Sequence, residues 1–180
     1  MKKLQKIYYQ RNKDYLFVDG YNIINYWEDL RKLSVINLED TRNKLIDIMS
    51  EYATFTGEKV ILVFDGYMVK KSPGAIYEIN GIIVVFTKEF ETADHFIERQ
   101  LHEIGRVRKV RVATSDNVEQ QIILSRGGIR ISARELEMEV NIVKNNIQRR
   151  TSELKKASKK DINPINSDLM VKLEDLKKKL

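Results

Sequence analysis

Short, compact apolar segments recur along this chain, and longer amphipathic segments lie between most of them. Five segments have the composition of β-strands: YLFV (15–18), VILVF (60–64), IIVVF (82–86), VRVA (110–113) and GIRI (129–132). Four of them are compact apolar runs, which is typical of strands buried on both faces of a parallel sheet. The fifth alternates, so we expect it at a sheet edge. The pattern predicts an α/β domain with right-handed crossovers.

Apolar residues spaced three and four positions apart predict helices over 38–56, 92–104, 116–125 and 133–149. Gly57 follows the first helix as a stop signal, and Ser132 with Glu135 forms a capping box at the start of the last. The segment 66–81 contains proline, glycine and two lysines without a long helical face. We therefore expect a surface loop there.

The tail after Arg150 is polar and contains Pro164. A last amphipathic helix is predicted over 167–180, with leucines at positions 169, 173, 176 and 180. This apolar stripe spans two heptads, short of the roughly three or four that indicate a coiled coil. The stripe could dock on the body of the protein, pair with a second chain or bind another partner, so the oligomeric state stays open.

Composition narrows the class of protein. A chain of 180 residues can form one domain with an appendage and a sizeable core. It contains no cysteine, which excludes disulfides and thiolate metal sites. No apolar run approaches the ~18 residues of a membrane span, and the basic start is not followed by the apolar core of a signal peptide. We expect a cytoplasmic protein with no membrane partner.

Positive charge is concentrated at the two ends of the chain. Residues 1–14 carry five basic and one acidic residue, and residues 141–180 carry eleven basic and five acidic residues. Residues 15–140, with 16 basic and 20 acidic residues, are slightly acidic. Basic ends of this kind commonly bind phosphates, although a lysine-rich tail can also be a simple solvated segment. Charge alone does not decide between the two.

Aspartates stand where the predicted strands end. Asp19, Asp65 and Asp116 follow three of the strands, and Asp94 falls in the first turn of the helix 92–104. Ligands of open α/β sheets bind outside the carboxyl ends of the strands, so the four carboxylates are expected to meet at one edge. Each aspartate alone could be a turn residue or a helix-terminal charge. Four of them at one predicted edge favour a shared site.

Clustered carboxylates repel one another unless a cation is held between them. Oxygen ligands suit a hard divalent ion, Mg²⁺ or Mn²⁺, which can polarise a phosphodiester and activate water. Asn22 lies next to Asp19 and could orient a phosphate, as could Ser115, for which helix capping is the simpler interpretation. Lys70 and Lys71, close to Asp65 in the predicted loop, are candidate substrate contacts, with an ordinary exposed loop as the alternative.

Five blocks of the sequence carry a resemblance to a known family: FVDGYNII (17–24), VFDG (63–66), TKEFETADHFIER (87–99), VATSDNVEQ (112–120) and GGIRISARELEMEV (127–140). In this order they resemble the NYN-domain proteins of the YacP type, which are relatives of PIN-domain nucleases. The resemblance covers about residues 14–150. It leaves out a basic N-terminal extension, 1–13, and a lysine-rich tail, 151–180. Phe90 and His95 depart from the family pattern, but neither departure changes any of the four carboxylates.

The resemblance implies a PIN-like three-layer α/β/α sandwich with a central parallel sheet of about five strands and a C-terminal helical tail. It also implies metal-dependent endoribonuclease activity. The type includes a ribosome-associated enzyme that cuts messenger RNA, so the ribosome and messenger RNA are the implied partners. The residues implied as catalytic are Asp19, Asp65, Asp94 and Asp116. Of these, Asp19, Asp94 and Asp116 are the implied metal ligands, and Asp65 is a supporting acid.

Other functions remain as alternatives. A non-catalytic RNA- or ribosome-binding module would be expected to lack one of the acids, and all four are present. A nuclease that processes tRNA or rRNA would use the same site. A phosphoryl-transfer signalling domain is disfavoured because Gly20 and Tyr21 follow Asp19 where such domains need a second acid.

Overall fold

The computed structural model describes residues 1–66, 73–104, 109–114 and 128–177, with side chains as far as Lys156. The chain divides into two compact units, Met1–Val140 and Asn141–Leu180. The first unit contains the whole sheet and the candidate site. The second consists of the continuation of one helix.

A seven-stranded sheet forms the centre of the first unit, in the order β1-β4-β5-β3-β2-β6-β7. The strands are β1 (Lys2–Leu4), β2 (Tyr15–Asp19), β3 (Lys59–Phe64), β4 (Pro73–Ile79), β5 (Ile82–Lys88), β6 (Val110–Ala113) and β7 (Ile129–Ile131). The five strands from β5 to β7 pair in parallel. They are the five strands expected from the sequence, and the alternating one, β7, lies at the edge. The predicted α/β fold is therefore confirmed.

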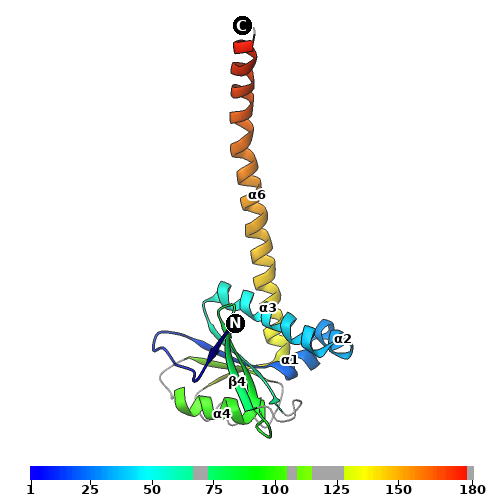
Figure 1. Cartoon of the computed structure of the whole chain (residues 1–180), viewed down its shortest axis with the longest axis vertical. Helices are drawn as coiled ribbons and strands as arrows, with labels where there is room; N and C mark the ends of the chain where they lie inside the picture. The colour runs from blue at the N-terminus through cyan, green and yellow to red at the C-terminus, as the bar shows by residue number, and fades with distance from the viewer. Residues whose placement is uncertain (67–72, 105–108, 115–127, 178–180) are drawn as a thin grey trace. The chain divides into compact units, whose positions relative to one another are not determined.

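Helices cover both faces of this sheet, as Figure 1 shows. On one face, α4 (Ala93–Ile104) packs its apolar side on Phe17, Ile61 and Val63 of the central strands. On the other face, α1 (Gly20–Tyr26) and α3 (Leu38–Thr56) contact β3, and α2 (Glu28–Ile36) packs on both of these helices. Because neighbouring side chains in a strand point to opposite faces, continuously apolar strands serve both layers. The three-layer arrangement follows from that pattern.

Two antiparallel strands, β1 and β4, extend the parallel sheet at one edge. The expectation of a loop over 66–81 is wrong for residues 73–79, which form β4 and pair with β5. Strands β4 and β5 are joined by Asn80 and Gly81, whose φ angles of 49° and 86° suit a tight hairpin turn. The dipeptide Asn-Gly is a strong hairpin signal, and it is present in the sequence. The N-terminal segment contributes β1, which pairs with β4.

The helix boundaries follow the capping residues. Asn37 caps α3 through bonds from two backbone amides, and Gly57 ends it in the left-handed conformation, at φ 78°. Ser132 and Glu135 form the predicted capping box at the start of α6 (Ala133–Lys177). The predicted helix 116–125 lies outside the described residues.

Helix α6 is longer than expected, because it continues from 133 through the polar segment and past Pro164. The two helices predicted over 133–149 and 167–180 are thus parts of one helix as far as Lys177. Residues 151–163 are polar, but they include four lysines with one leucine, one glutamate and one alanine, and all of these residue types propagate helices well. Polarity was therefore a poor signal for a break. No described helix has an apolar stretch of the length needed to cross a membrane.

Candidate active site

Asp19 lies at the junction of a strand and a helix. It is the last residue of β2 and the N-cap of α1, where its Oδ1 accepts a hydrogen bond of 3.1 Å from the backbone nitrogen of Asn22. Gly20 then packs directly on Phe64, since a Cβ atom at Gly20 would lie 2.4 Å from Cε1 of that ring. Only glycine lets α1 begin this close to β3 and leaves Asp19 at the sheet edge.

Asp65 follows the neighbouring strand, β3, and its position is set by the residue after it. The backbone nitrogen of Gly66 donates a hydrogen bond of 2.7 Å to the buried Oγ1 of Thr87 on β5. A Cβ atom at Gly66 would lie 2.0 Å from the carbonyl oxygen of Thr87, so no other residue fits there without moving the backbone. Asp65 therefore leaves the sheet beside Asp19, because β2 and β3 are parallel neighbours.

Asp94 comes from the other face of the sheet, in the first turn of α4. Thr92 caps this helix, with its Oγ1 accepting a bond of 3.3 Å from the backbone nitrogen of His95. The Oδ1 atom of Asp94 is buried and has no hydrogen-bond partner among the described residues. A buried carboxylate oxygen without a partner is costly, which makes it a candidate ligand for a cation.

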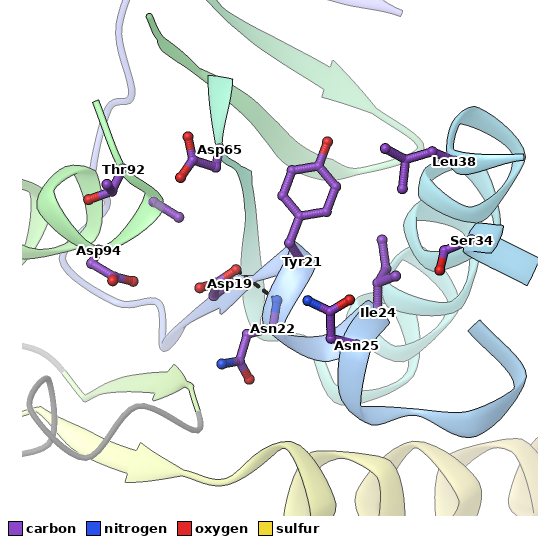
Figure 2. A pocket seen from close by; sticks show the side chains of 11 residues that line it. Asp19, Tyr21, Asn22, Ile24, Asn25, Ser34, Leu38, Asp65, Thr92 and Asp94 are labelled. Atoms are coloured by element: carbon purple, nitrogen blue, oxygen red, sulfur yellow. Dashed lines mark hydrogen bonds between the residues drawn. The ribbon is translucent and has the colours of Figure 1, made fainter. Parts of the chain in front are cut away.

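These three carboxylates line one cavity of about 600 Å³. In Figure 2, Asp19, Asp65 and Asp94 gather on one side of it with Thr92, and Tyr21, Ile24 and Leu38 lie on the other. The cavity thus lies at the carboxyl ends of β2 and β3, as the strand-end aspartates predict. It combines an acidic wall with an aromatic and apolar one.

The electrostatics of Asp19 reflect this crowding. Burial, with smaller contributions from the nearby charges of Asp94 and Asp65, raises the pKa of the Asp19 carboxyl from its ordinary 3.8 to about 6. The backbone hydrogen bond from Asn22 acts in the opposite direction but is weaker than the burial. The site therefore holds negative charge at a cost, which a bound cation would relieve.

The donor set fits a hard divalent ion such as Mg²⁺ or Mn²⁺, because every candidate ligand is a carboxylate oxygen. The unpartnered Oδ1 of Asp94 and the raised pKa of Asp19 agree with such an ion. Within the described residues, no three histidine, aspartate or glutamate side chains come close enough to form a metal centre by themselves. The fourth predicted acid, Asp116, lies outside the described residues.

The other predicted site residues fall into two groups. Asn22 lines the cavity, as does Asn25 one turn further along α1. Ser115, Lys70 and Lys71 lie, like Asp116, outside the described residues.

Tyr21 and Thr92 are among the cavity residues that were not expected from the sequence. The hydroxyl of Tyr21 accepts a hydrogen bond of 3.0 Å from Nη1 of Arg42, and its ring packs edge-on against Phe64. Thr92 lies beside Asp94 on the acidic side. Thr92 has the type and spacing of a helix cap, so a signal for it was present, whereas the place of Tyr21 depends on its contacts with Arg42 and Phe64.

Comparison with known proteins agrees with this architecture. The model of a family described as YacP-like NYN domain matches residues 16–178, a range that includes most of the tail. The protein YacP of Bacillus subtilis (strain 168) is 41% identical over 142 residues, which are 78% of this chain and 83% of that protein.

Two crystal structures of Rae1 (YacP) from Bacillus subtilis are similar to the fold. One, of a point mutant, has a TM-score of 0.70 and 39% identity, and covers 79% of this chain and 84% of its own. The other has a TM-score of 0.69 and 34% identity, and covers 92% of this chain and 95% of its own.

Proposed function

The chain belongs to the YacP-like NYN domain family, and from this premise we propose that it is a metal-dependent endoribonuclease that hydrolyses RNA phosphodiesters. Membership of the family implies a nuclease-like function that acts on RNA. The observation that carries the finer proposal is the cavity into which Asp19, Asp65 and Asp94 converge. A cavity with an acidic wall does not bind a polyanion by charge, so it needs a cation to accept a phosphodiester.

The proposal assigns roles to the residues around the cavity. Asp19 and Asp94 would hold Mg²⁺ or Mn²⁺, together with Asp116. The ion, when bound, supplies a polarised phosphate oxygen and an activated water. Asp65 supports the acidic wall from the adjacent strand, and the amide of Asn22 orients the phosphate.

The opposite wall would exclude water from the reacting phosphate. Tyr21 is held in place by the bond from Arg42 and by its contact with Phe64, so its ring can pack against the sugar or base beside the scissile bond. Ser115, Lys70 and Lys71 are proposed to contact phosphates away from the ion.

We further propose that the substrate is messenger RNA on the ribosome in the cytoplasm. The basic chain ends support a polyanionic target, because lysine and arginine that neutralise phosphates give most of the affinity for RNA. Free tRNA or rRNA is the alternative substrate class. A non-catalytic RNA-binding role is the second alternative, and the retention of all four acids speaks against it.

The experiment compares free mRNA, translating ribosomes, tRNA and rRNA as substrates, each with Mg²⁺, Mn²⁺ or a chelator. Asp19→Asn is the inactive variant, and Asp29→Asn, at an exposed acid outside the cavity, is the matched control. We expect cleavage of ribosome-bound mRNA by wild type and Asp29→Asn, only with a metal. Cleavage of free tRNA or rRNA at the same rate would contradict the proposed substrate and favour tRNA or rRNA processing. RNA binding without any cleavage would support the non-catalytic role.

A further inference from the structure

Phe90 has an unusual backbone for its side chain. Its φ angle is +67°, in the left-handed region, and its side chain is 80% exposed. A single exposed apolar residue is ordinary on a protein surface. A bulky aromatic residue with positive φ is a genuine outlier, because glycine or asparagine would adopt that conformation at less cost. Residues of this kind concentrate at functional sites, so the position calls for an explanation.

The turn around Phe90 is held by contacts that do not involve its ring. Thr87 Oγ1 accepts the bond from Gly66 and donates one of 2.5 Å to the carbonyl oxygen of Glu91. The backbone nitrogen of Glu91 donates to the carbonyl oxygen of Lys88 at 3.0 Å, and the Glu91 carboxylate pairs with Arg99. The surrounding structure thus imposes the left-handed backbone and presents the ring to solvent.

Phe90 stands between two hollows of opposite character. Two residues after it, Thr92 lines the acidic cavity beside Asp94 (Figure 2). Two residues before it, Lys88 lines a second hollow of about 260 Å³, in which three cations, Lys3, Lys88 and Arg99, outnumber one acid, Glu91. Two peptide units span at most about 7 Å between Cα atoms, so the Cα atom of Phe90 lies within about that distance of one lining residue of each hollow.

This placement fits a single strand of nucleic acid. With its scissile phosphate at the acidic cavity, the strand would pass Phe90 and bring the neighbouring phosphates to the cations of the second hollow. Every base has a face that can stack on an aromatic ring, whatever the sequence. One exposed ring offers too little area for a protein partner, since a stable protein interface buries about 800 Å² on each side.

We propose that Phe90 is a stacking platform for an unpaired base of the RNA substrate next to the scissile phosphate. The inference rests on the proposed ribonuclease function and makes it specific for unpaired RNA. A base held in a duplex is already stacked on its neighbours, so duplex RNA would gain nothing from this ring.

The test measures RNA binding in a chelator, where no metal-dependent cleavage interferes. The probes are a single-stranded RNA of about 12 nucleotides, within the usual range of single-strand sites, carrying one 2-aminopurine, and the same RNA as a duplex. The variants are Phe90→Gly, which suits the positive φ, and Phe90→Trp, which keeps an aromatic face. Tyr8→Gly is the matched control, because Tyr8 is 81% exposed and no residue within two positions of it lines either hollow.

We expect Phe90→Gly to weaken single-strand binding by about 5- to 100-fold, the range of one lost base–aromatic stack, and to abolish the stacking quench of 2-aminopurine. Its duplex affinity and its melting temperature should not fall. Phe90→Trp and Tyr8→Gly should bind as wild type. Unchanged single-strand binding by Phe90→Gly, or no quench in wild type, would overturn the inference. An equal loss of single-strand and duplex binding with a lower melting temperature would also overturn it, in favour of a structural role.

Asp19→Asn separates this inference from the proposed function. It should lose cleavage in Mg²⁺ or Mn²⁺ and keep the 2-aminopurine quench, because Phe90 is intact. Retained cleavage by Asp19→Asn would contradict the assigned active site. The binding measurements would still decide whether Phe90 stacks on a base.

Discussion

The Oδ1 atom of Asp19 accepts a hydrogen bond of 3.1 Å from the backbone nitrogen of Asn22, so one carboxylate both caps α1 and forms a wall of the acidic cavity. The cap stabilises the ionised form, yet burial and two neighbouring aspartates still raise the pKa of Asp19 to about 6. The Asp19 carboxylate therefore stabilises α1 as its cap, while its negative charge destabilises the folded state at neutral pH. That conflict is expected where a cation completes a site.

The first prediction concerns the stability of the metal-free protein with Asp19→Asn. Asparagine caps helices as well as aspartate does, and it carries no charge. The folded pKa of Asp19 is raised above its ordinary 3.8, so wild type loses stability as the pH rises from about 4 to 6. At pH 7 the variant should be more stable by about 2–3 kcal/mol, from the 1.36 kcal/mol of each pKa unit.

Urea unfolding in a chelator at pH 4 and pH 7 measures this effect. The gain should be small at pH 4, where the carboxyl is largely protonated in the folded state, and larger at pH 7. Asp29→Asn is the control, since that side chain is exposed. A gain of the same size at both pH values would mean that the charge of Asp19 is not what the fold resists.

The second prediction is that Mn²⁺ or Mg²⁺ raises the melting temperature of wild type. An ion that binds the folded state alone adds about 2.7 kcal/mol of stability at 100 times its dissociation constant. Asp94→Asn should lose most of this gain, because it removes a proposed ligand. Thermal unfolding with and without the ion measures the shift. An equal shift in wild type and Asp94→Asn would place the ion elsewhere.

The third prediction concerns Thr87, which links the end of β3 to the turn before α4. Thr87→Val keeps the shape but loses the bonds to Gly66 and Glu91, leaving buried backbone groups without a partner. We expect a loss of stability of about 1–3 kcal/mol and slower RNA cleavage, since Asp65 and the Phe90 turn both depend on it. Thr87→Ser keeps the hydroxyl and should lose less than half as much. Equal losses in the two variants would deny the hydroxyl this role.

The fourth prediction concerns Gly20, which packs on Phe64. An added methyl at Gly20 would overlap the ring, and the ring is fully buried and cannot turn away. Gly20→Ala should therefore cost about 1–3 kcal/mol, as overpacking usually does. Combining it with Phe64→Leu should cost less than the sum of the two single changes. If the losses of unfolding free energy measured by chemical unfolding were additive, there would be no steric coupling between the two residues.

The sequence predicts the parallel part of the fold well and its edges poorly. The five parallel strands were predictable because buried strands are compact apolar runs. Strand β4 was missed because its side chains are only partly buried and its composition resembles a loop, although the Asn80-Gly81 signal was present. The sequence predicts helix α6 in two pieces because a polar segment that contains a proline is typical of a break between helices.

The candidate site was predictable where it follows from topology. Asp19 and Asp65 follow parallel neighbouring strands, and Asp94 starts a helix next to them, so their meeting needs no tertiary information beyond strand order. Tyr21 could not be assigned to the cavity wall in the same way, because its position depends on its contacts with Arg42 and Phe64. Those contacts join distant parts of the chain and leave no local pattern.

Metal-dependent RNA cleavage by Asp94→Asn, measured beside wild type, tests whether the acidic cavity cleaves RNA. The variant replaces one carboxyl oxygen of Asp94 by an amide nitrogen and removes the negative charge from the first turn of α4. We expect its cleavage rate to fall at least about 100-fold, as for loss of one transition-state contact, with the circular dichroism spectrum unchanged. Cleavage at the wild-type rate by a folded Asp94→Asn protein would show that the acidic cavity is not the active site.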